Sequence, residues 1–475
     1  MNIKPSRREV FRGLLTLAAA CAPAQTKRKP NLIIILADDL GYGDVGCYGS
    51  PDVATPNIDA LARAGIRFTN GYVTNCVCSP TRAGIMTGRY QQRYGHEFNI
   101  GPARREIVEK LGLPVSEITL PQMLKQGGYA TGMVGKWHLG AIPGMTPMDR
   151  GFDEFFGFLH GANSYITRKT NGGATIPDAG EGAVLSQILE KRVNPVFRGR
   201  DPFDEPDYLT DAFGREAVAF IDRHKKDPFF LYLPFNAVHE PLQTTAKYLD
   251  RVAHIKDPRH RTLASMTVAM DDNIGKVTAK LRESGLENDT LIFFLSDNGC
   301  PTYTHAGSNG PLSGSKCTLF EGGFRVPFVV KWTGKLPAGK VVHRMVSSLD
   351  IVPTFLTAAQ VKPPADRELD GVDLVPYLTG GNAKSPHEIL FWRNGPNSAV
   401  RRGNWKLMQI GISSRLYDLS KDIGEKTNLA ANHPEVVREL RAAWIAWNAK
   451  MIAPKWPPRG SPKIPVHGET IEWSI

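Results

Sequence analysis

Short apolar runs alternate with amphipathic segments along most of the chain, and the first such run covers residues 32–36. This run is rich in β-branched residues and lies between Pro30 and Asp38, as a strand buried on both faces would. Four further runs predict strands at residues 129–134, 229–233, 291–295 and 326–330. The pattern therefore predicts a sheet that is covered on both sides.

Helices are predicted between these strands. Thr55 and Pro56 provide the cap and first-turn proline of a helix, and Gly65 ends it. Residues 119–124 predict a second helix, and apolar residues recur at helical spacing over residues 263–281. Strands separated by helices indicate an α/β fold with helices on both faces of the sheet.

The pattern changes after about residue 356. Residues 398–419 predict short strands joined by turns, and residues 434–451 predict one amphipathic helix. We therefore expect a main domain over residues 30–355 and a smaller C-terminal α+β subdomain over residues 356–475. The stretch 167–205 is rich in glycine, proline and charge, and we expect it to be an excursion near a substrate cleft.

The first 24 residues are typical of an export signal. Arg7, Arg8 and Arg12 form a basic start, a short apolar run follows, and small residues near Ala24 offer a cleavage site. The run is too short to span a bilayer. Paired arginines favour twin-arginine export over general secretion, and a lipid on Cys21 is a third route that would anchor the protein. We expect a periplasmic or extracellular protein without a transmembrane helix.

Composition and charge restrict the kinds of partner. Apolar residues make up 41% of the chain and charged residues 22%, as in ordinary soluble proteins. The formal charge is +11, and removal of residues 1–24, which hold four basic residues and one acidic residue, leaves +8. A basic surplus favours anionic partners. We do not expect nucleic acid, because no Lys/Arg run has interleaved aromatic residues.

Polar residues directly follow two predicted strands. Asp38 and Asp39 come after the run at 32–36, and Asp297 and Asn298 come after residues 291–295. In open α/β sheets, ligands bind beyond the carboxyl ends of the strands. Three carboxylates and an amide there would suit a hard cation such as Ca²⁺ or Mg²⁺. The alternative is that each pair only caps the following helix or turn.

Cys78 is the candidate nucleophile. Pro80 marks the start of a predicted helix, which places Cys78 near the positive end of the helix dipole. Arg82 follows one helical turn later and could face the same anion. A thiol there could be activated. The alternatives are a small core residue or a disulfide with a cysteine such as Cys47, since five cysteines would remain after export and at least one must stay outside any pairing.

These residues also carry a family resemblance. Cys78, Pro80 and Arg82, with the Thr-Gly-Arg that follows, resemble the sulfatase family's Cys-x-Pro-x-Arg element, whose cysteine is oxidised to formylglycine (3-oxoalanine) before export. Further segments resemble sulfatase segments in the family's order: residues 38–44, 135–140, 237–241, 296–299, 314–316, 321–327, 348–354, 416–419 and 425–429. The resemblance covers about residues 31–430, and so many ordered segments argue against chance.

The resemblance implies an alkaline phosphatase-like α/β fold, with a large mixed, mostly parallel sheet sandwiched by helices. Residues 30–355 would then be the catalytic domain, and residues 356–475 would add a short antiparallel sheet and a helix. It further implies that a formylglycine-generating enzyme modifies Cys78, and that Ca²⁺, rather than Mg²⁺, is bound at residue 78 and by four oxygen ligands: Asp38, Asp39, Asp297 and Asn298.

The resemblance also implies catalytic roles. Formylglycine, as its hydrate, would attack the sulfur of a sulfate ester, and Arg82 would hold that hydrate. Lys136 and Lys316 would donate to the sulfate oxygens. His239, with Lys316, is the candidate acid for the departing alcohol. His138 is the candidate base that removes the second hydroxyl proton, so that sulfate leaves and the aldehyde re-forms.

The substrate is predicted less directly. Residues 149–165 resemble the part of sulfatases that lines the entrance, which makes His160, Asn163 and Ser164 candidate substrate-binding residues. With the basic surplus, we expect a sulfated carbohydrate rather than a small aryl or choline ester. The alternatives are a phosphodiesterase or phosphonate monoester hydrolase of the same superfamily, and a non-catalytic polyanion-binding protein.

Overall fold

The computed structural model describes residues 28–100, 111–166, 173–175, 195–304 and 306–475. The predicted export signal and Cys21 lie outside these ranges, as does most of the predicted excursion at 167–205. Within them, no helix is both long enough and apolar enough to cross a membrane.

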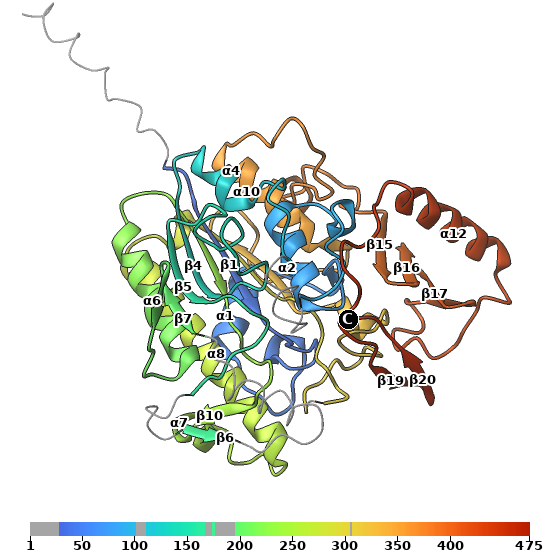
Figure 1. Ribbon diagram of the computed structural model, residues 1–475, viewed down its shortest axis with the longest axis horizontal. Helices are drawn as coiled ribbons and strands as arrows, with labels where there is room; N and C mark the ends of the chain where they lie inside the picture. The colour runs from blue at the N-terminus through green and yellow to red at the C-terminus, as the bar shows by residue number, and fades with distance from the viewer. Residues whose placement is uncertain (1–27, 101–110, 167–172, 176–194, 305) are drawn as a thin grey trace, which may run out of the picture.

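A ten-stranded mixed sheet forms the centre of the described part of the chain (Figure 1). Its strands, in spatial order, are β13 (Lys340–Val342), β2 (Ile66–Phe68), β12 (Phe328–Trp332), β11 (Thr290–Ser296), β1 (Asn31–Ala37), β9 (Phe229–Pro234), β4 (Ala130–Lys136), β5 (Glu154–Phe158), β7 (Val196–Arg198) and β8 (Asp201–Phe203). The five central strands, from β11 to β5, run parallel, and the strands next to them on either side are antiparallel. The large mixed sheet is therefore confirmed.

The five predicted strands are all present, and the last of them begins two residues later than predicted. The run at 326–330 becomes β12, which starts at Phe328 and lies antiparallel to β11. Pro327 precedes it, and a proline has no N–H to donate to a ladder. The strand therefore starts only after the proline.

Both faces of the sheet are apolar. In β1, Leu32, Ile34 and Leu36 enter one core, while Ile33 and Ile35 enter the core on the opposite face. Successive side chains of a strand point to opposite faces, and each buried aliphatic side chain stabilises the fold by about 1.5–3 kcal/mol. A run without polar alternation is therefore what a central strand of this sheet requires.

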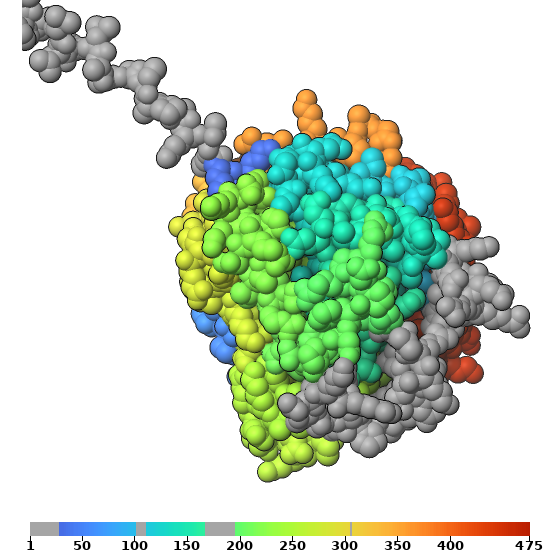
Figure 2. Space-filling model, turned by 60° about the vertical axis from the view of Figure 1, so that its left-hand side comes forward, coloured from blue at the N-terminus to red at the C-terminus, as the bar shows by residue number. Residues whose placement is uncertain are grey.

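Helices cover both faces of the sheet (Figure 1). The core around Ile33 is closed by α1 (Pro56–Ala64), α6 (Leu209–His224) and α8 (Pro258–Glu283). The opposite core is closed by α2 (Cys78–Thr87), α4 (Leu120–Lys125) and α10 (Ile351–Ala359). The predicted helices at 56–64, 119–124 and 263–281 correspond to α1, α4 and α8. On the surface, α6 lies beside residues 130–166 (Figure 2).

Shorter elements connect these layers. They include the helices α7 (Ala246–Leu249), α9 (Glu321–Phe324) and α11 (Val375–Leu378), and the paired strands β3 (Gly71–Tyr72) with β14 (Val346–Ser347) and β6 (Gly173–Thr175) with β10 (Gln243–Thr245). The 3₁₀ helices are η1 (Gly46–Tyr48), η2 (Gln91–Arg93), η3 (Asp250–Val252), η4 (Glu287–Asp289) and η5 (Ser348–Asp350).

The C-terminal part is a small α+β unit beside the main sheet (Figure 1). It has a four-stranded antiparallel sheet of β15 (Ile389–Asn394), β16 (Asn397–Arg402), β17 (Trp405–Ile410) and β18 (Ser413–Asp418), followed by α12 (Pro434–Asn448) and the hairpin β19 (Lys463–Val466) and β20 (Glu469–Glu472). Trp392 and Trp473 pack into the core of the main sheet. The boundary at residue 355 stays a prediction.

Candidate active site

The carboxyl ends of β1 and β11 bring four polar side chains together. Because Ala37 pairs with Ser296 in the parallel ladder, the residues that follow both strands meet at one edge of the sheet. The Asp39 N–H donates to Asp297 Oδ1 at 3.3 Å, and Asn298 Nδ2 donates to Asp39 Oδ1 at 2.7 Å. These residues, with Asp38, are almost fully buried. The two predicted pairs therefore form one cluster.

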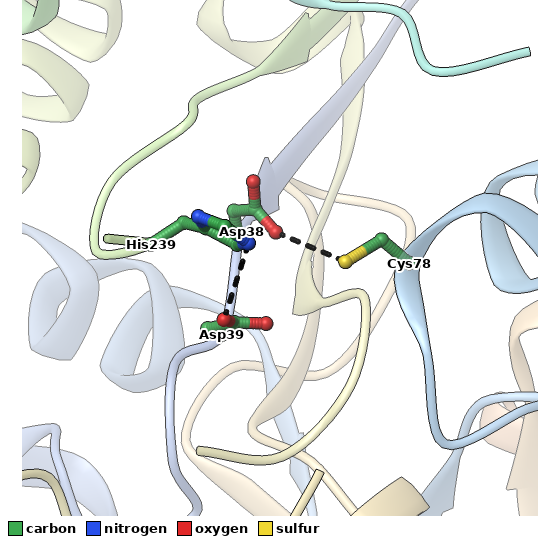
Figure 3. A group of neighbouring side chains, drawn as sticks. All are labelled: Asp38, Asp39, Cys78 and His239. Carbon is green, nitrogen blue, oxygen red and sulfur yellow. Dashed lines mark hydrogen bonds and ion pairs between the residues drawn. The ribbon is translucent and has the colours of Figure 1, made fainter. Parts of the chain in front are cut away.

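Helix α2 points its amino end at this cluster. It begins at Cys78, two residues before the predicted start at Pro80, because a proline is tolerated within the first helical turn. Val77 caps the helix in an extended conformation, and Gly88, with φ of 68°, ends it. Cys78 Sγ lies 3.6 Å from Asp38 Oδ1 (Figure 3). Burial raises the pKa of Cys78, so the unmodified residue is a neutral thiol.

Arg82 links the helix to the cluster from below. Its Nε donates to Asp297 Oδ2 at 2.9 Å, and its Nη1 donates to the carbonyl oxygen of Lys136 at 2.8 Å. Burial alone would lower the pKa of Arg82, but Asp297 and Asp38 raise it. The guanidinium is therefore a fixed positive charge at the base of the site.

Two lysines complete the charge balance. Lys136, the last residue of β4, lies 2.5 Å from Asp38 Oδ2, and Lys316 lies 2.7 Å from Asp39 Oδ1. Burial would raise the pKa of Asp39, but the charge and hydrogen bond of Lys316, together with His239 and Lys136, lower it below its ordinary value. Burial and the neighbouring Asp38 raise the pKa of Asp297 to about 6. Three carboxylates are thus held beside three cationic side chains.

The donor set fits a hard cation. Ligand atoms of Asp38, Asp39, Cys78 and His239 all lie within 4.8 Å of one another (Figure 3). Asn298 Oδ1 is buried and has no hydrogen-bond partner within the described ranges. A buried amide oxygen without a donor is costly unless something positive faces it. Carboxylate and amide oxygens are what Ca²⁺ prefers.

The His138 ring has one nitrogen in contact with a carbonyl oxygen and one without a partner in the described ranges. Its Nε2 lies 3.0 Å from the carbonyl oxygen of Ile100, and because that oxygen only accepts, the proton is on Nε2. Its Nδ1 then carries the lone pair, and Nδ1 is buried without a hydrogen-bond partner among the residues that the structure describes. Burial, followed by the charge of Lys136, lowers the pKa of His138 well below 6.5.

His239 stands at the open side of the cluster. Its Nδ1 contacts the carbonyl oxygen of Glu240 at 2.6 Å, and its Nε2 lies 3.6 Å from Asp39 Oδ2. Burial lowers the pKa of His239 to about 3, so the ring is neutral in this arrangement. Its side chain keeps 15% of its exposed area, against 0% for Arg82.

The predicted entrance segment lies beside both histidines. Gly161 packs against the His138 ring so closely that a Cβ there would come within 2.9 Å of the ring. Tyr165 donates to the carbonyl oxygen of His239 at 2.8 Å. His160 is exposed and Ser164 half-buried, while Asn163 is almost buried. Beyond this segment, β6 pairs with β10, which follows the His239 loop.

Two features were not foreseen from the sequence. His96 lies directly behind the first turn of α2, with its Nε2 2.6 Å from Ser79 Oγ. Its position, 18 residues after Cys78, follows no recognisable spacing, so no signal in the sequence could have identified it. The second feature concerns the cysteines: none of the five in the described part of the chain forms a disulfide, so the alternative of a Cys78–Cys47 bridge was wrong.

Comparison with known proteins agrees with this geometry. The Sulfatase family model matches residues 30–361, and the model described as N-sulphoglucosamine sulphohydrolase, C-terminal, matches residues 315–448. The chain is 35% identical over 408 residues to N-acetylgalactosamine-6-sulfatase of Canis lupus familiaris, covering 83% of this chain and 75% of that protein. It is 35% identical over 470 residues to human arylsulfatase A, covering 90% and 89%.

A solved structure shows the same architecture. Ps i-CgsB in complex with k-i-k-neocarrahexaose superposes with a TM-score of 0.81 at 35% identity, covering 90% of this chain and 95% of that one. The alkaline phosphatase-like fold expected from the sequence is therefore confirmed. The family model covers well over half of the chain, including both strand ends and the amino end of α2. The chain belongs to the sulfatase family and is a sulfuric ester hydrolase.

Proposed function

We propose that the protein hydrolyses sulfate esters of a carbohydrate with a formylglycine made from Cys78 and a bound Ca²⁺. One observation carries the proposal: Cys78, at the amino end of α2, points into a buried cluster of carboxylates and cationic side chains. Cys78 Sγ stands in for the oxygens of the formylglycine hydrate, which supplies the nucleophile. A non-catalytic binding protein would not need a convertible cysteine at that place.

The cation would be held by Asp38, Asp39, Asp297 and Asn298, with residue 78 as a further ligand. When bound, it would polarise the sulfate and make a hydroxyl of the hydrate more acidic. The unpartnered Asn298 Oδ1 supports this assignment. We expect calcium rather than magnesium, since a set of several carboxylates and an amide suits the larger ion.

The cationic side chains have separate tasks. Arg82 is locked between Asp297 and the Lys136 carbonyl, so it would hold residue 78 in place. Lys136, at the end of β4, and Lys316, on the loop before α9, would donate to the sulfate oxygens, where negative charge accumulates as the S–O bond breaks. Both lysines are buried, which strengthens their interaction with an anion.

The two histidines would transfer protons for different groups, His138 for residue 78 and His239 for the departing alcohol. His138, with the lone pair of Nδ1 unpartnered and buried, would act as the base towards residue 78. His239 would donate to the departing alcohol, with Lys316 beside it. Its ring must first gain a proton, which the negative charge of a bound sulfate would favour.

A sulfated carbohydrate is the substrate class we propose. The relatives include an enzyme named for N-acetylgalactosamine-6-sulfate, and the similar solved structure holds a neocarrahexaose. The basic surplus of the chain would attract polyanionic glycans. His160, Asn163 and Ser164 would contact the sugar at the entrance. The proposal also includes three expectations from the sequence. They are the export signal, a maturation enzyme that oxidises Cys78, and a catalytic domain over residues 30–355.

The nucleophile is tested by mass spectrometry and one variant. In protein from its native host, the peptide that carries residue 78 should have the mass of formylglycine. Cys78→Ala should lower kcat on an aryl sulfate by at least about 10³-fold, since the covalent route is lost. An unmodified thiol in fully active protein would overturn the proposal.

The cation and the substrate are tested separately. Chelation should abolish turnover and lower the melting temperature, and Ca²⁺ should restore both; an unchanged melting temperature would contradict a cation at the cluster. A panel of sulfated mono- and disaccharides, differing in ring and in sulfate position, should contain a better substrate than an aryl sulfate. Faster hydrolysis of an aryl phosphodiester would instead favour a phosphodiesterase.

A further inference from the structure

Ser79 is the second residue of α2 and lies between two histidines. Its Oγ is 2.6 Å from His96 Nε2 and 2.7 Å from the carbonyl oxygen of His138. Ser79 and His96 are both fully buried. The Ser79 hydroxyl therefore connects the side chain of His96, which has no assigned role, with the backbone of His138, the candidate base.

The protons along this bridge follow from the atoms involved. The carbonyl oxygen of His138 can only accept, so the single Ser79 hydroxyl proton is donated to it. The short contact on the other side then needs a proton on His96 Nε2. Burial lowers the pKa of His96 to about 3, so its ring is neutral at the pH of most assays and donates from Nε2. His96 therefore donates a hydrogen bond to Ser79, and Ser79 donates one to the carbonyl oxygen of His138.

The acceptor of this chain is a strained residue. His138 has φ of 59°, in the left-handed region that is costly for a residue with a Cβ. Such a conformation persists only where surrounding contacts fix it. The hydroxyl of Ser79 holds its carbonyl, while the carbonyl of Ile100 holds its ring.

The segment that carries His96 also holds the start of α2. Asn99 Oδ1 accepts the backbone N–H of Ser79 at 2.9 Å, so two groups of this segment fix the residue next to Cys78. Trp456 lies edge-on to His96, with ring centroids 4.7 Å apart. Its Nε1 donates to the carbonyl oxygen of Phe98 at 3.2 Å. The segment is thus fixed on the side away from the site.

We propose that His96 is a positioning residue which, through Ser79, fixes residue 78 and the His138 ring in their reactive relation. This inference rests on the proposed roles of residues 78 and 138. His96 itself would not touch the substrate, because Ser79 stands between it and the site. Removing the His96 N–H would leave the Ser79 hydroxyl with one partner, the carbonyl oxygen of His138. Residue 78 and the His138 ring would both be held less firmly.

The test compares two substitutions at one position. His96→Leu removes the donor, whereas His96→Gln keeps an N–H close to the place of Nε2. Since displacement of reacting groups by about 1 Å can cost about 10²-fold, we expect His96→Leu to lower kcat about 10- to 100-fold with KM changed less than about threefold. His96→Gln should recover most of kcat. Ser79→Ala should lower kcat similarly, and the Ser79→Ala/His96→Leu double variant should lose little more.

His224 offers a matched control. His224 is the last residue of α6, and its Nε2 contacts Oε1 of Glu154 at 2.6 Å. Glu154 begins β5, at the edge of the sheet opposite the cluster. His224→Leu should leave kcat unchanged, so a loss common to both leucine variants would indicate general destabilisation and overturn the inference. Equal kcat for His96→Leu and wild type would also overturn it, as would a His96→Gln no better than His96→Leu.

The remaining outcomes are also decisive. If His96→Leu does not fold, Ser79→Ala decides: full activity there overturns the inference, and a kcat loss with unchanged KM and melting temperature supports it. Failure of the proposed function gives another result. Cys78→Ala would then remain active, whether or not the His96 variants lose activity. An inactive Cys78→Ala together with a fully active His96→Leu would reject only the positioning role.

Discussion

The molecule buries two clusters of charge that differ in what they join. The site cluster consists of Asp38, Asp39, Asp297, Arg82, Lys136 and Lys316, and lies at the ends of the central strands. The support cluster consists of Glu321, Arg325, Arg401, Lys406 and Glu425, and lies between α9 and the C-terminal sheet. Both contain carboxylates and cations almost without exposure, and we propose that only the site cluster takes up a cation and an anionic substrate.

The support cluster is closed by residues from both parts of the chain. Lys406 Nζ lies 3.0 Å from Glu321 Oε1 and 2.7 Å from Glu425 Oε1. Glu425 also accepts the backbone N–H of Glu321 at 2.7 Å, and Tyr72 donates to Glu321 at 2.6 Å. Glu321 starts α9, five residues after Lys316, so the C-terminal sheet holds the loop that supplies one lysine of the site.

The site cluster differs in the kind of atom that it leaves without a hydrogen bond. In the support cluster those atoms, Glu321 Oε1, Glu425 Oε1 and Lys406 Nζ, lie in ion pairs with one another. In the site cluster they include the neutral acceptors Asn298 Oδ1 and His138 Nδ1, which have neither a donor nor an ion pair in the described ranges. Burial and the nearby charge of Asp38 raise the pKa of Asp297 to about 6, since like charges lie close together in this cluster. A cation and an anionic substrate would relieve both conditions. We therefore propose that buried charge fixes the fold in the support cluster and serves to bind ligands in the site cluster.

The largest effect is expected in the support cluster. Lys406→Met should lower the free energy of unfolding by about 3–5 kcal/mol, because it leaves two carboxylates buried without their shared cation. The loss should be the same with Ca²⁺ and with chelator. Denaturant unfolding measures it, and Lys421→Met is the control, since Lys421 is 84% exposed and 3.8 Å from Asp418. Equal stability of the two variants would contradict the role of the support cluster.

The same substitution in the site cluster should act on turnover. Lys316→Met should lower kcat about 10²- to 10³-fold, the cost of removing one donor from a developing negative charge, or about 3–4 kcal/mol. Its effect on unfolding should be smaller in Ca²⁺ than in chelator, because the cation would take over the pairing of Asp39. Steady-state kinetics and unfolding in both conditions test this. If Lys316→Met lowered the free energy of unfolding equally with Ca²⁺ and with chelator, Lys316 would act as Lys406 does, and the prediction would be wrong.

The contrast also explains what could be predicted from the sequence. The site residues directly follow strand ends, and the apolar runs of β1 and β11 are local signals, so the meeting of Asp38 with Asp297 follows from sheet topology alone. The amino end of α2 was placed nearly correctly from Pro80 and Arg82. Where the signal is local, pattern and physical chemistry were sufficient.

The contacts within the support cluster and those of His96 gave no such local signal, although residues 321–327 and 425–429 resemble sulfatase segments. Glu321 and Lys406 are 85 residues apart, and His96 and Trp456 are 360 apart, with no periodicity that links them. Glu321 and Lys406 alone would be typical of exposed positions, and neither His96 nor Trp456 alone indicates its partner. Their burial depends on how the C-terminal sheet packs on the main domain, which only the structure provides.

A smaller effect should appear in the pH dependence of stability. Burial raises the pKa of Glu425 from its ordinary 4.5 to about 7, although Lys406 opposes this. The folded protein then keeps a proton that the unfolded chain has lost, so stability falls as the pH rises from about 4.5 to about 7. Glu425→Gln should remove about 3 kcal/mol of this fall. Parallel pH profiles of unfolding free energy for the two proteins would contradict the protonated state.

The smallest effect should come from Trp456, which links the C-terminal segment to the His96 segment and carries no charge. Trp456→Phe keeps a ring against His96 but removes the N–H donated to the carbonyl oxygen of Phe98. One lost hydrogen bond should lower the free energy of unfolding by about 1 kcal/mol, with kcat changed less than about threefold because His96 still reaches Ser79. Trp405→Phe, on the C-terminal sheet, is the control for a tryptophan away from this contact. A kcat loss as large as that of His96→Leu would mean that the C-terminal segment acts on the site directly, and the division between a supporting and a reacting region would then fail.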